Sequence, residues 1–221
     1  MVNAPGLTLA LDASTCRGTV AVLRNGVVVA VREAVMRGEH EERLMPAVLA
    51  ALADAGAVPR DVARVVCGAG PGAFTSLRIA AGIAKGVAHG AGVPLFEVSS
   101  LALVAAGAEP GLPPGRCIAT LDAMRGERYA QRVLVLADGT VRVDGVQSLA
   151  TIEQLAAADA PVVGPLQPTP RMPHARGVVA MLADCIAAGP VDLDAWEPSY
   201  GRLAEAQVKW EAAHGRPLAA G

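Results

Sequence analysis

The sequence predicts an α/β protein. Three features carry this prediction: two β-branched runs joined by Asn25-Gly26, two segments with apolar residues at helical spacing, and a glycine-rich loop between a buried strand and the second helix. Asn-Gly between β-branched runs predicts a hairpin, because both turn residues need positive φ. A length of 221 residues allows either one α/β domain or two compact lobes that share an interface.

The first hundred residues alternate between strands and helices. Strands are expected at 7–11, 19–24, 27–31, 62–67 and 94–98, and helices at 39–55, 75–89 and 99–107, the last capped by Ser99 or Ser100. The first helix has an apolar stripe formed by Leu44, Met45, Val48, Leu49 and Leu52. Pro46 lies inside this stripe, so we expect either a kink there or a helix that effectively starts near Met45.

A Pro- and Gly-rich stretch at 109–115 is the best candidate for a domain boundary. We therefore expect an N-terminal lobe at 1–108 and a smaller C-terminal lobe with a docking tail at 109–221. Within the second lobe, strands are expected at 117–121, 128–136, 141–147 and 161–163, helices at 151–158 and 175–188, and a loop at 164–173. The tail, which contains Trp196, Tyr200 and Trp210, is expected to dock onto another surface.

Composition excludes several classes of protein. A net charge of -2 is not the electrostatic footprint of a protein that holds nucleic acid alone, and 3% aromatic residues do not favour base-stacking platforms. The four cysteines are far apart, which favours reduced thiols in a cytoplasmic protein. The four histidines have no metal-ligand spacing, so we expect no metal and no cofactor. No segment is expected to cross or anchor in a membrane.

Two loops could hold an anion. In the turn that follows the first strand, backbone N–H groups can hold a phosphate, and the carboxylate can orient a magnesium-bound water. The glycine-rich loop leads into a helix N-terminus with free N–H groups. The residues concerned are Asp12, Ser14, Thr15, Gly70, Gly72, Thr75 and Arg78. The alternatives are an ordinary hairpin turn and a tight strand-to-helix turn, with Thr75 as the N-cap and Phe74 packed inward.

Several stretches together resemble the TsaB (YeaZ) family, which takes part in bacterial synthesis of threonylcarbamoyladenosine on tRNA. The resemblance is dense over 7–104 and intermittent afterwards, and Gly70-Pro71-Gly72-Ala73-Phe74-Thr75 is its most specific part. The other stretches are 9–15, Glu39-His40 with 43–46, 94–101, 121–129 and Glu197-Pro198-Ser199-Tyr200 with Arg202 and Trp210. Ala69 and Gly38 stand where the family often has arginine, and Ser76 replaces a usual glycine.

The resemblance implies an actin-like ATPase fold (ASKHA, ribonuclease H-like) of two related lobes, the second reduced. It also implies a catalytic paralogue, TsaD, in which two metal-binding histidines stand at the positions of Ser100 and Val104. Neither residue can replace a histidine ligand, so by resemblance this chain has kept the fold and lost the metal. The two anion-loop segments are then vestiges of a nucleotide site, and the chain itself has no catalytic residues.

The resemblance further implies a non-catalytic subunit that binds and activates TsaD in N6-threonylcarbamoylation of the adenosine next to the anticodon of tRNAs that read ANN codons. TsaD is the expected partner in a heterodimer; TsaE and tRNA would be met only through the complex, and a homodimer is an alternative assembly. The competing hypotheses are an independent enzyme, either kinase-like or glycopeptidase-like, and TsaD itself.

The expected partner surface is a helical bundle made with the helices at 39–55 and 75–89. Leu44, Val48 and Leu52, at i, i+4 and i+8 of the first helix, would meet small residues of the second. The residues assigned to this surface are Glu39, His40, Leu44, Val48, Leu52, Leu77, Ala80, Ala81, Ala84 and Ala88. Packing of the same residues against the chain's own sheet is the alternative.

Overall fold

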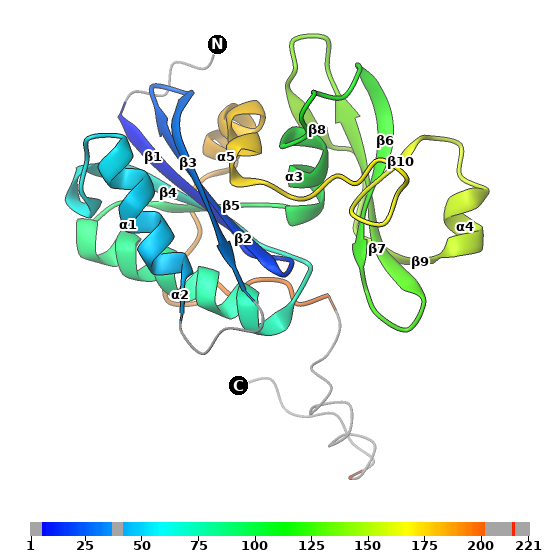
Figure 1. Cartoon of the computed structure of the whole chain (residues 1–221), viewed down its shortest axis with the longest axis horizontal. Helices are drawn as coiled ribbons and strands as arrows, with labels where there is room; N and C mark the ends of the chain where they lie inside the picture. Colours follow the sequence, from blue (N-terminus) through cyan, green and yellow to red (C-terminus); the bar gives the residue numbers. More distant parts are fainter. Residues whose placement is uncertain (1–5, 37–41, 202–213, 215–221) are drawn as a thin grey trace.

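The structure is a computed structural model that describes residues 6–36, 42–201 and 214. Within these residues the chain forms two β-sheets, with helices between the sheets and on the outer face of the first sheet (Figure 1). The helices are α1 (Leu44–Asp54), η1 (Pro59–Asp61), α2 (Phe74–Ala91), α3 (Ser100–Ala106), α4 (Ile152–Ala156), η2 (Ala175–Ala180) and α5 (Leu182–Ala188). None of the described helices is long and apolar enough to cross a membrane.

The first sheet has the strand order β3-β2-β1-β4-β5. Its strands are β1 (Leu7–Asp12), β2 (Arg17–Arg24), β3 (Val27–Val35), β4 (Val62–Gly68) and β5 (Leu95–Val98). β1, β2 and β3 pair antiparallel, whereas β4 pairs parallel with both β1 and β5. Asn25 and Gly26 both have positive φ, which confirms the predicted hairpin.

The second sheet repeats most of the first. Its strands are β6 (Gly115–Asp122), β7 (Glu127–Val135), β8 (Val141–Val143), β9 (Ser148–Thr151) and β10 (Val162–Val163). The order β8-β7-β6-β10 has the same sequence of antiparallel, antiparallel and parallel pairings as β3-β2-β1-β4. In the described part of the chain this sheet has no counterpart of β5, so the two lobes are related and the second is reduced. The strand predicted at 141–147 is present but shorter, because β8 ends at Val143; β9, which pairs with β7, was not predicted.

Three predictions about helix ends can be compared with the structure. α1 begins at Leu44, so the missing N–H of Pro46 lies in the first turn, where no intrahelical partner is needed. α3 begins after Ser99, whose hydroxyl accepts a hydrogen bond from Ala102 N at 3.3 Å, as predicted. The single helix predicted at 175–188 is instead η2 followed by α5.

The start of α2 also differs from the prediction. Its N-cap residue is Ala73, which has no capping side chain, and Thr75 is exposed. Phe74 is 38% exposed rather than packed inward. The reason lies in the tail: the ring of Tyr200 packs on that of Phe74 with 4.5 Å between centroids, at the surface of the lobe.

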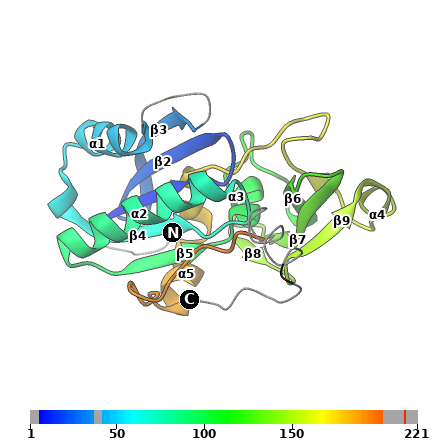
Figure 2. The ribbon, with the colours of Figure 1, turned by 90° about the horizontal axis from the view of Figure 1, so that it is seen from below.

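Each face of the first sheet has its own core. Side chains alternate along the strands, so Leu9 and Leu11 face α1 and α2, whereas Ala10 faces α3, η2 and α5. α1 and α2 thus lie side by side on one face, and the other three helices fill the space between the sheets (Figures 1 and 2).

The chain returns to the first lobe after the second sheet. η2 contacts β1, β2 and β3, and α5 contacts β5. Helices from beyond residue 108 thus complete the core of the first sheet. The division of the chain into two domains at 108/109 stays a prediction.

Candidate functional site

The turn after β1 is sealed by its own hydrogen bonds. Asp12 is fully buried, and its Oδ1 accepts from the backbone N and the hydroxyl of Ser14, at 3.0 and 2.8 Å. Its Oδ2 accepts from the Ser100 hydroxyl. Burial raises the pKa of Asp12, and the three hydrogen bonds oppose that rise. Both carboxylate oxygens are therefore occupied by groups of the chain itself.

The glycine-rich loop closes against this turn. A Cβ on Gly72 would lie 2.1 Å from the Ser14 carbonyl oxygen, and one on Gly70 would lie 2.2 Å from the Ser199 carbonyl oxygen. Gly70 N donates to the Ser100 hydroxyl at 3.0 Å, and Ala73 N donates to Ser14 O at 2.8 Å. The glycines are thus required by close packing within the chain, which favours the tight-turn alternative over an open cradle for phosphate.

The structure brings together only some of the residues assigned to a vestigial nucleotide site. Asp12, Ser14, Gly70 and Gly72 lie together, although the sequence presents the two loops as separate candidates. Thr15 turns away, and its hydroxyl donates to Arg17 O at 3.2 Å. The exposed residues of α2 are also outside the cluster: Thr75 has no capping role, and Arg78 lies 5.2 Å above the Phe74 ring.

Sequence reasoning missed Ser100 and Ser199 as members of this cluster. Ser100 links the Asp12 carboxylate to the glycine-rich loop, and Ser199 N donates to Ala69 O at 2.7 Å. Ser199 arrives from more than a hundred residues away, and no local pattern indicates that contact. In the described part of the chain, no group of three or more His, Cys, Asp or Glu side chains is placed to hold a metal ion.

The tail packs on the rest of the chain up to Gly201, whereas Trp210 lies outside the described residues. Val191 N donates to Leu95 O at 2.9 Å, and the buried indole of Trp196 donates to Glu97 at 2.6 Å. Tyr129 of β7 then donates to the Tyr200 carbonyl at 3.3 Å. The tail therefore joins the first sheet, the glycine-rich loop and the second sheet.

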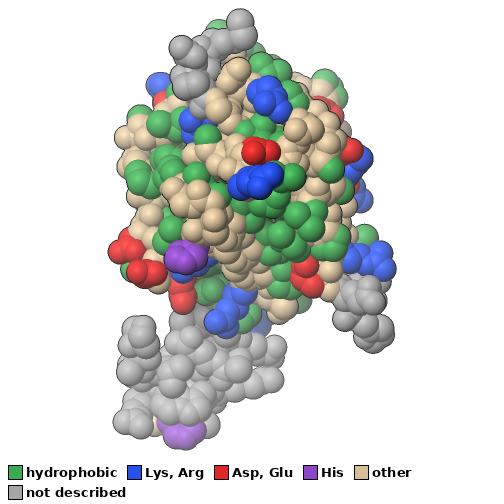
Figure 3. Space-filling model, turned by 90° about the vertical axis from the view of Figure 1, so that its left-hand side faces the viewer, with side chains coloured by type: hydrophobic (Ala, Val, Ile, Leu, Met, Phe, Trp, Pro, Cys, Tyr) green, Lys and Arg blue, Asp and Glu red, His purple; other side chains and the backbone are tan. Residues whose placement is uncertain are grey.

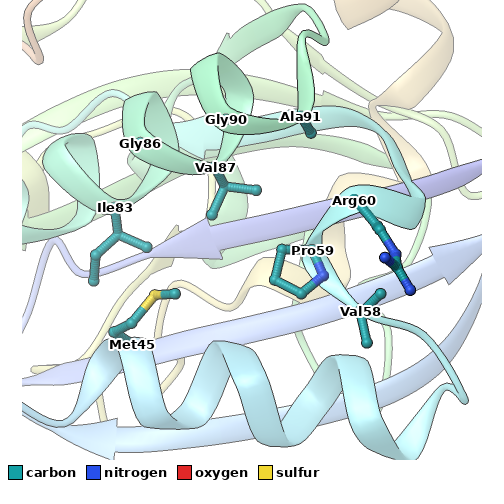
Figure 4. Close-up of a pocket in the computed structure, with 9 residues that line it drawn as sticks. All are labelled: Met45, Val58, Pro59, Arg60, Ile83, Gly86, Val87, Gly90 and Ala91. Atoms are coloured by element: carbon teal, nitrogen blue, oxygen red, sulfur yellow. The ribbon is translucent and has the colours of Figure 1, made fainter.

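An apolar groove of about 590 Å³ lies between α1 and α2. Figure 4 shows Met45 of α1 facing Ile83 and Val87 of α2 across it, with Val58 and Pro59 beyond. Figure 3 shows that side of the molecule, where hydrophobic side chains (green) and other uncharged groups (tan) occupy most of the surface, with few charged side chains. This groove is an open concave feature on the face that carries α1 and α2.

The structure corrects the residues assigned to the partner surface. The assigned side chains of α1 and α2 are all buried in the free chain, because they face its own sheet: Leu44, Val48, Leu52, Leu77, Ala80, Ala81, Ala84 and Ala88. Glu39 and His40 lie outside the described residues. The outward faces of the two helices instead carry Met45, Leu49, Ile83 and Gly86, and Leu49 is 46% exposed.

α2 also presents a row of exposed glycines. Gly82, Gly86 and Gly90 are spaced by four residues, and a Cβ built on any of them meets nothing within 4 Å. Packing inside the chain therefore does not require glycine at these positions. Glycine there has a cost for the free chain, because the free energy of helix formation is about 1 kcal/mol less favourable for glycine than for alanine.

The strand order, the pairing senses and the reduced repeat of the second sheet define an actin-like ATPase (ASKHA) fold. Two solved structures of YeaZ proteins from Pseudomonas aeruginosa share it: they are 31% identical to this chain, with TM-scores of 0.76 and 0.75. The alignments cover 89% and 88% of this chain, and 100% and 99% of those chains. One is described as similar to the peptidase YEAZ.

The family model of TsaD, tRNA N6-adenosine threonylcarbamoyltransferase, matches residues 32–167. The Escherichia coli tRNA threonylcarbamoyladenosine biosynthesis protein TsaB is 40% identical over 55% of this chain and 52% of its own length. The Bacillus subtilis TsaB is 29% identical over 91% of this chain and 96% of its own length. The chain thus spans about half of the Escherichia coli relative and nearly all of the Bacillus one. It belongs to the TsaB (YeaZ) family, and the match to the TsaD model reflects the paralogy between the two.

Proposed function

We propose that this chain is a non-catalytic subunit that binds and activates TsaD in N6-threonylcarbamoylation of the adenosine next to the anticodon of tRNAs that read ANN codons. The observation that carries this proposal is the apolar groove between α1 and α2. The names of the relatives, which place them in the biosynthesis of threonylcarbamoyladenosine, supply the reaction.

The groove suits a helical partner. Its walls are Met45, Ile83 and Val87, and its glycines leave the α2 backbone open to close approach. Small residues on one helix allow a second helix to pack with its backbone near the first. Burial of the half-buried Met45 and Ile83 and of the exposed Val58 would then favour association. The bundle proposed from the sequence is therefore kept, with its contacts moved to the outward faces of the two helices.

TsaD is proposed as the partner in a heterodimer. TsaE and tRNA would be reached through that complex, and a homodimer would compete for the same groove. The vestigial role proposed for the Asp12 and Gly70 loops is consistent with a chain that activates a catalytic paralogue, because the Asp12 carboxylate is buried and both its oxygens accept from Ser14 or Ser100.

Reconstitution tests the proposal. The chain is mixed with purified TsaD from the same organism, the mass of the complex is measured, and threonylcarbamoyl transfer to tRNA is assayed with and without the chain. We expect a complex and a faster transfer. Absence of both would refute the proposal. Titration of the isolated chain with ATP and magnesium tests the competing hypothesis, which predicts micromolar binding and turnover.

A further inference from the structure

The groove between α1 and α2 has one ionisable side chain among its described lining residues. Arg60, in η1, lies at one end of the groove beside Val58, and Met45 and Ile83 lie at the other end (Figure 4). The remaining lining is apolar side chain and glycine backbone. The groove is therefore chemically asymmetric along its length.

Arg60 has no carboxylate partner in the described part of the chain, although acidic residues are close in sequence and on the neighbouring helix. Asp61 accepts a hydrogen bond from Val58 N at 2.9 Å, and Asp54 pairs with Arg32 at 2.6 Å. Glu42 accepts from the backbone N of Met45 at 3.0 Å, at the start of α1. These carboxylates are engaged elsewhere, so the Arg60 guanidinium is left to solvent.

An apolar groove does not by itself fix how a helix lies in it. Hydrophobic attraction is non-directional, so a partner helix could dock in either direction or shift by one turn at little difference in free energy. A single charged group at one end removes this degeneracy, because covering it without a counter-ion is unfavourable.

We propose that Arg60 fixes the orientation in which the helices of TsaD dock on this groove, by pairing with a carboxylate of TsaD at the η1 end. This inference rests on the proposed function and goes beyond it by naming a specificity-determining residue and the chemistry of its partner. A second copy of the chain is a less suitable partner for Arg60. Its described carboxylates near the groove already accept hydrogen bonds or form an ion pair within their own chain.

The test measures the affinity of purified TsaD for Arg60→Glu and Arg60→Lys at low and high salt. The matched control is Arg125→Glu, an exposed arginine in the turn between β6 and β7 of the other lobe. We expect Arg60→Glu to weaken binding about tenfold at low salt and less at high salt, because salt screens a charge pair at the rim. Arg60→Lys and Arg125→Glu should bind as the wild type does.

A charge-reversal scan completes the experiment. We expect one Asp→Lys or Glu→Lys variant of TsaD to restore binding to Arg60→Glu. If Arg60→Glu binds like the wild type, or if no TsaD variant rescues it, the inference is wrong while the proposed function stands. If the wild-type chain does not bind TsaD at all, both fail. If Arg60→Glu changes only self-association, measured by sedimentation, the groove is an interface between copies.

Discussion

Replacing Gly86 by alanine should change the stability of the free chain and its affinity for TsaD in opposite directions. The new Cβ meets nothing within 4 Å, so the free chain bears no steric cost. Alanine is favoured over glycine in a helix interior by about 1 kcal/mol, and it also reduces the entropy of the unfolded chain. We therefore expect the free energy of unfolding to rise by about 0.5–1 kcal/mol, and Tm by roughly 1–4 °C for a chain of this length.

Binding should change in the opposite direction. Gly86 lines the groove, and a methyl group there would hold a closely packed helix away from α2. Overpacking of a fitted contact costs about 1–3 kcal/mol, so the affinity for TsaD should fall at least about fivefold. Urea unfolding and calorimetric titration with TsaD measure the two effects.

The control is Gly82→Ala, one turn earlier on α2 and outside the groove lining. It should give the same gain in stability and keep wild-type affinity. If Gly86→Ala stabilises the chain and still binds TsaD as tightly as the wild type, no partner backbone approaches α2 there, and the argument from the glycines is wrong.

Three further predictions concern the fold itself. Burial lowers the pKa of His174 from 6.5 to about 4, so the free energy of unfolding should fall as pH drops from 6.5 to 4, by roughly 3 kcal/mol at most. His174→Asn, which keeps an acceptor for the N–H of Arg176, should flatten that dependence in urea titrations at each pH; an unchanged slope would contradict the assignment. Trp196→Phe removes the hydrogen bond to Glu97 and should lower the free energy of unfolding by about 1–2 kcal/mol, and equal stability would mean that the indole N–H contributes nothing. Asp12→Ala leaves three donors without their acceptor and should destabilise the chain by about 2–4 kcal/mol, while neither it nor the wild type binds ATP in calorimetry; tight ATP binding by the wild type that Asp12→Ala abolishes would overturn this reading.

The sequence predicted correctly those turns and helix ends that are set by a few neighbouring residues. The Asn25-Gly26 hairpin, the cap of α3 by Ser99 and the start of α1 near Met45 each depend on a few neighbouring residues. The same reasoning failed at Phe74, because Tyr200 packs on the Phe74 ring from a distant part of the chain. It also failed at 175–188, which folds as η2 and α5 rather than as one helix.

The candidate sites show the same limit. The sequence singled out the Asp12 turn and the glycine-rich loop as two candidates, but did not indicate that they pack together or that Ser100 and Ser199 close the contact. The apolar stripe of α1 was visible in the sequence, whereas the side of the helix that faces the sheet was not. Leu44 and Val48 are consequently core residues, whereas Met45 of the same stripe lines the groove.

The sequence by itself determined the α/β class, most strand and helix positions and the resemblance to a family, because these depend on periodicity, turn chemistry and short motifs. Only the tertiary structure decided which helix faces are free, which glycines serve internal packing, and which described carboxylates near the groove are already paired. The physical reason is that burial and pairing depend on contacts between residues far apart in the chain: Gly72 is a glycine because Ser14 packs on it, whereas Gly86 has open space above it.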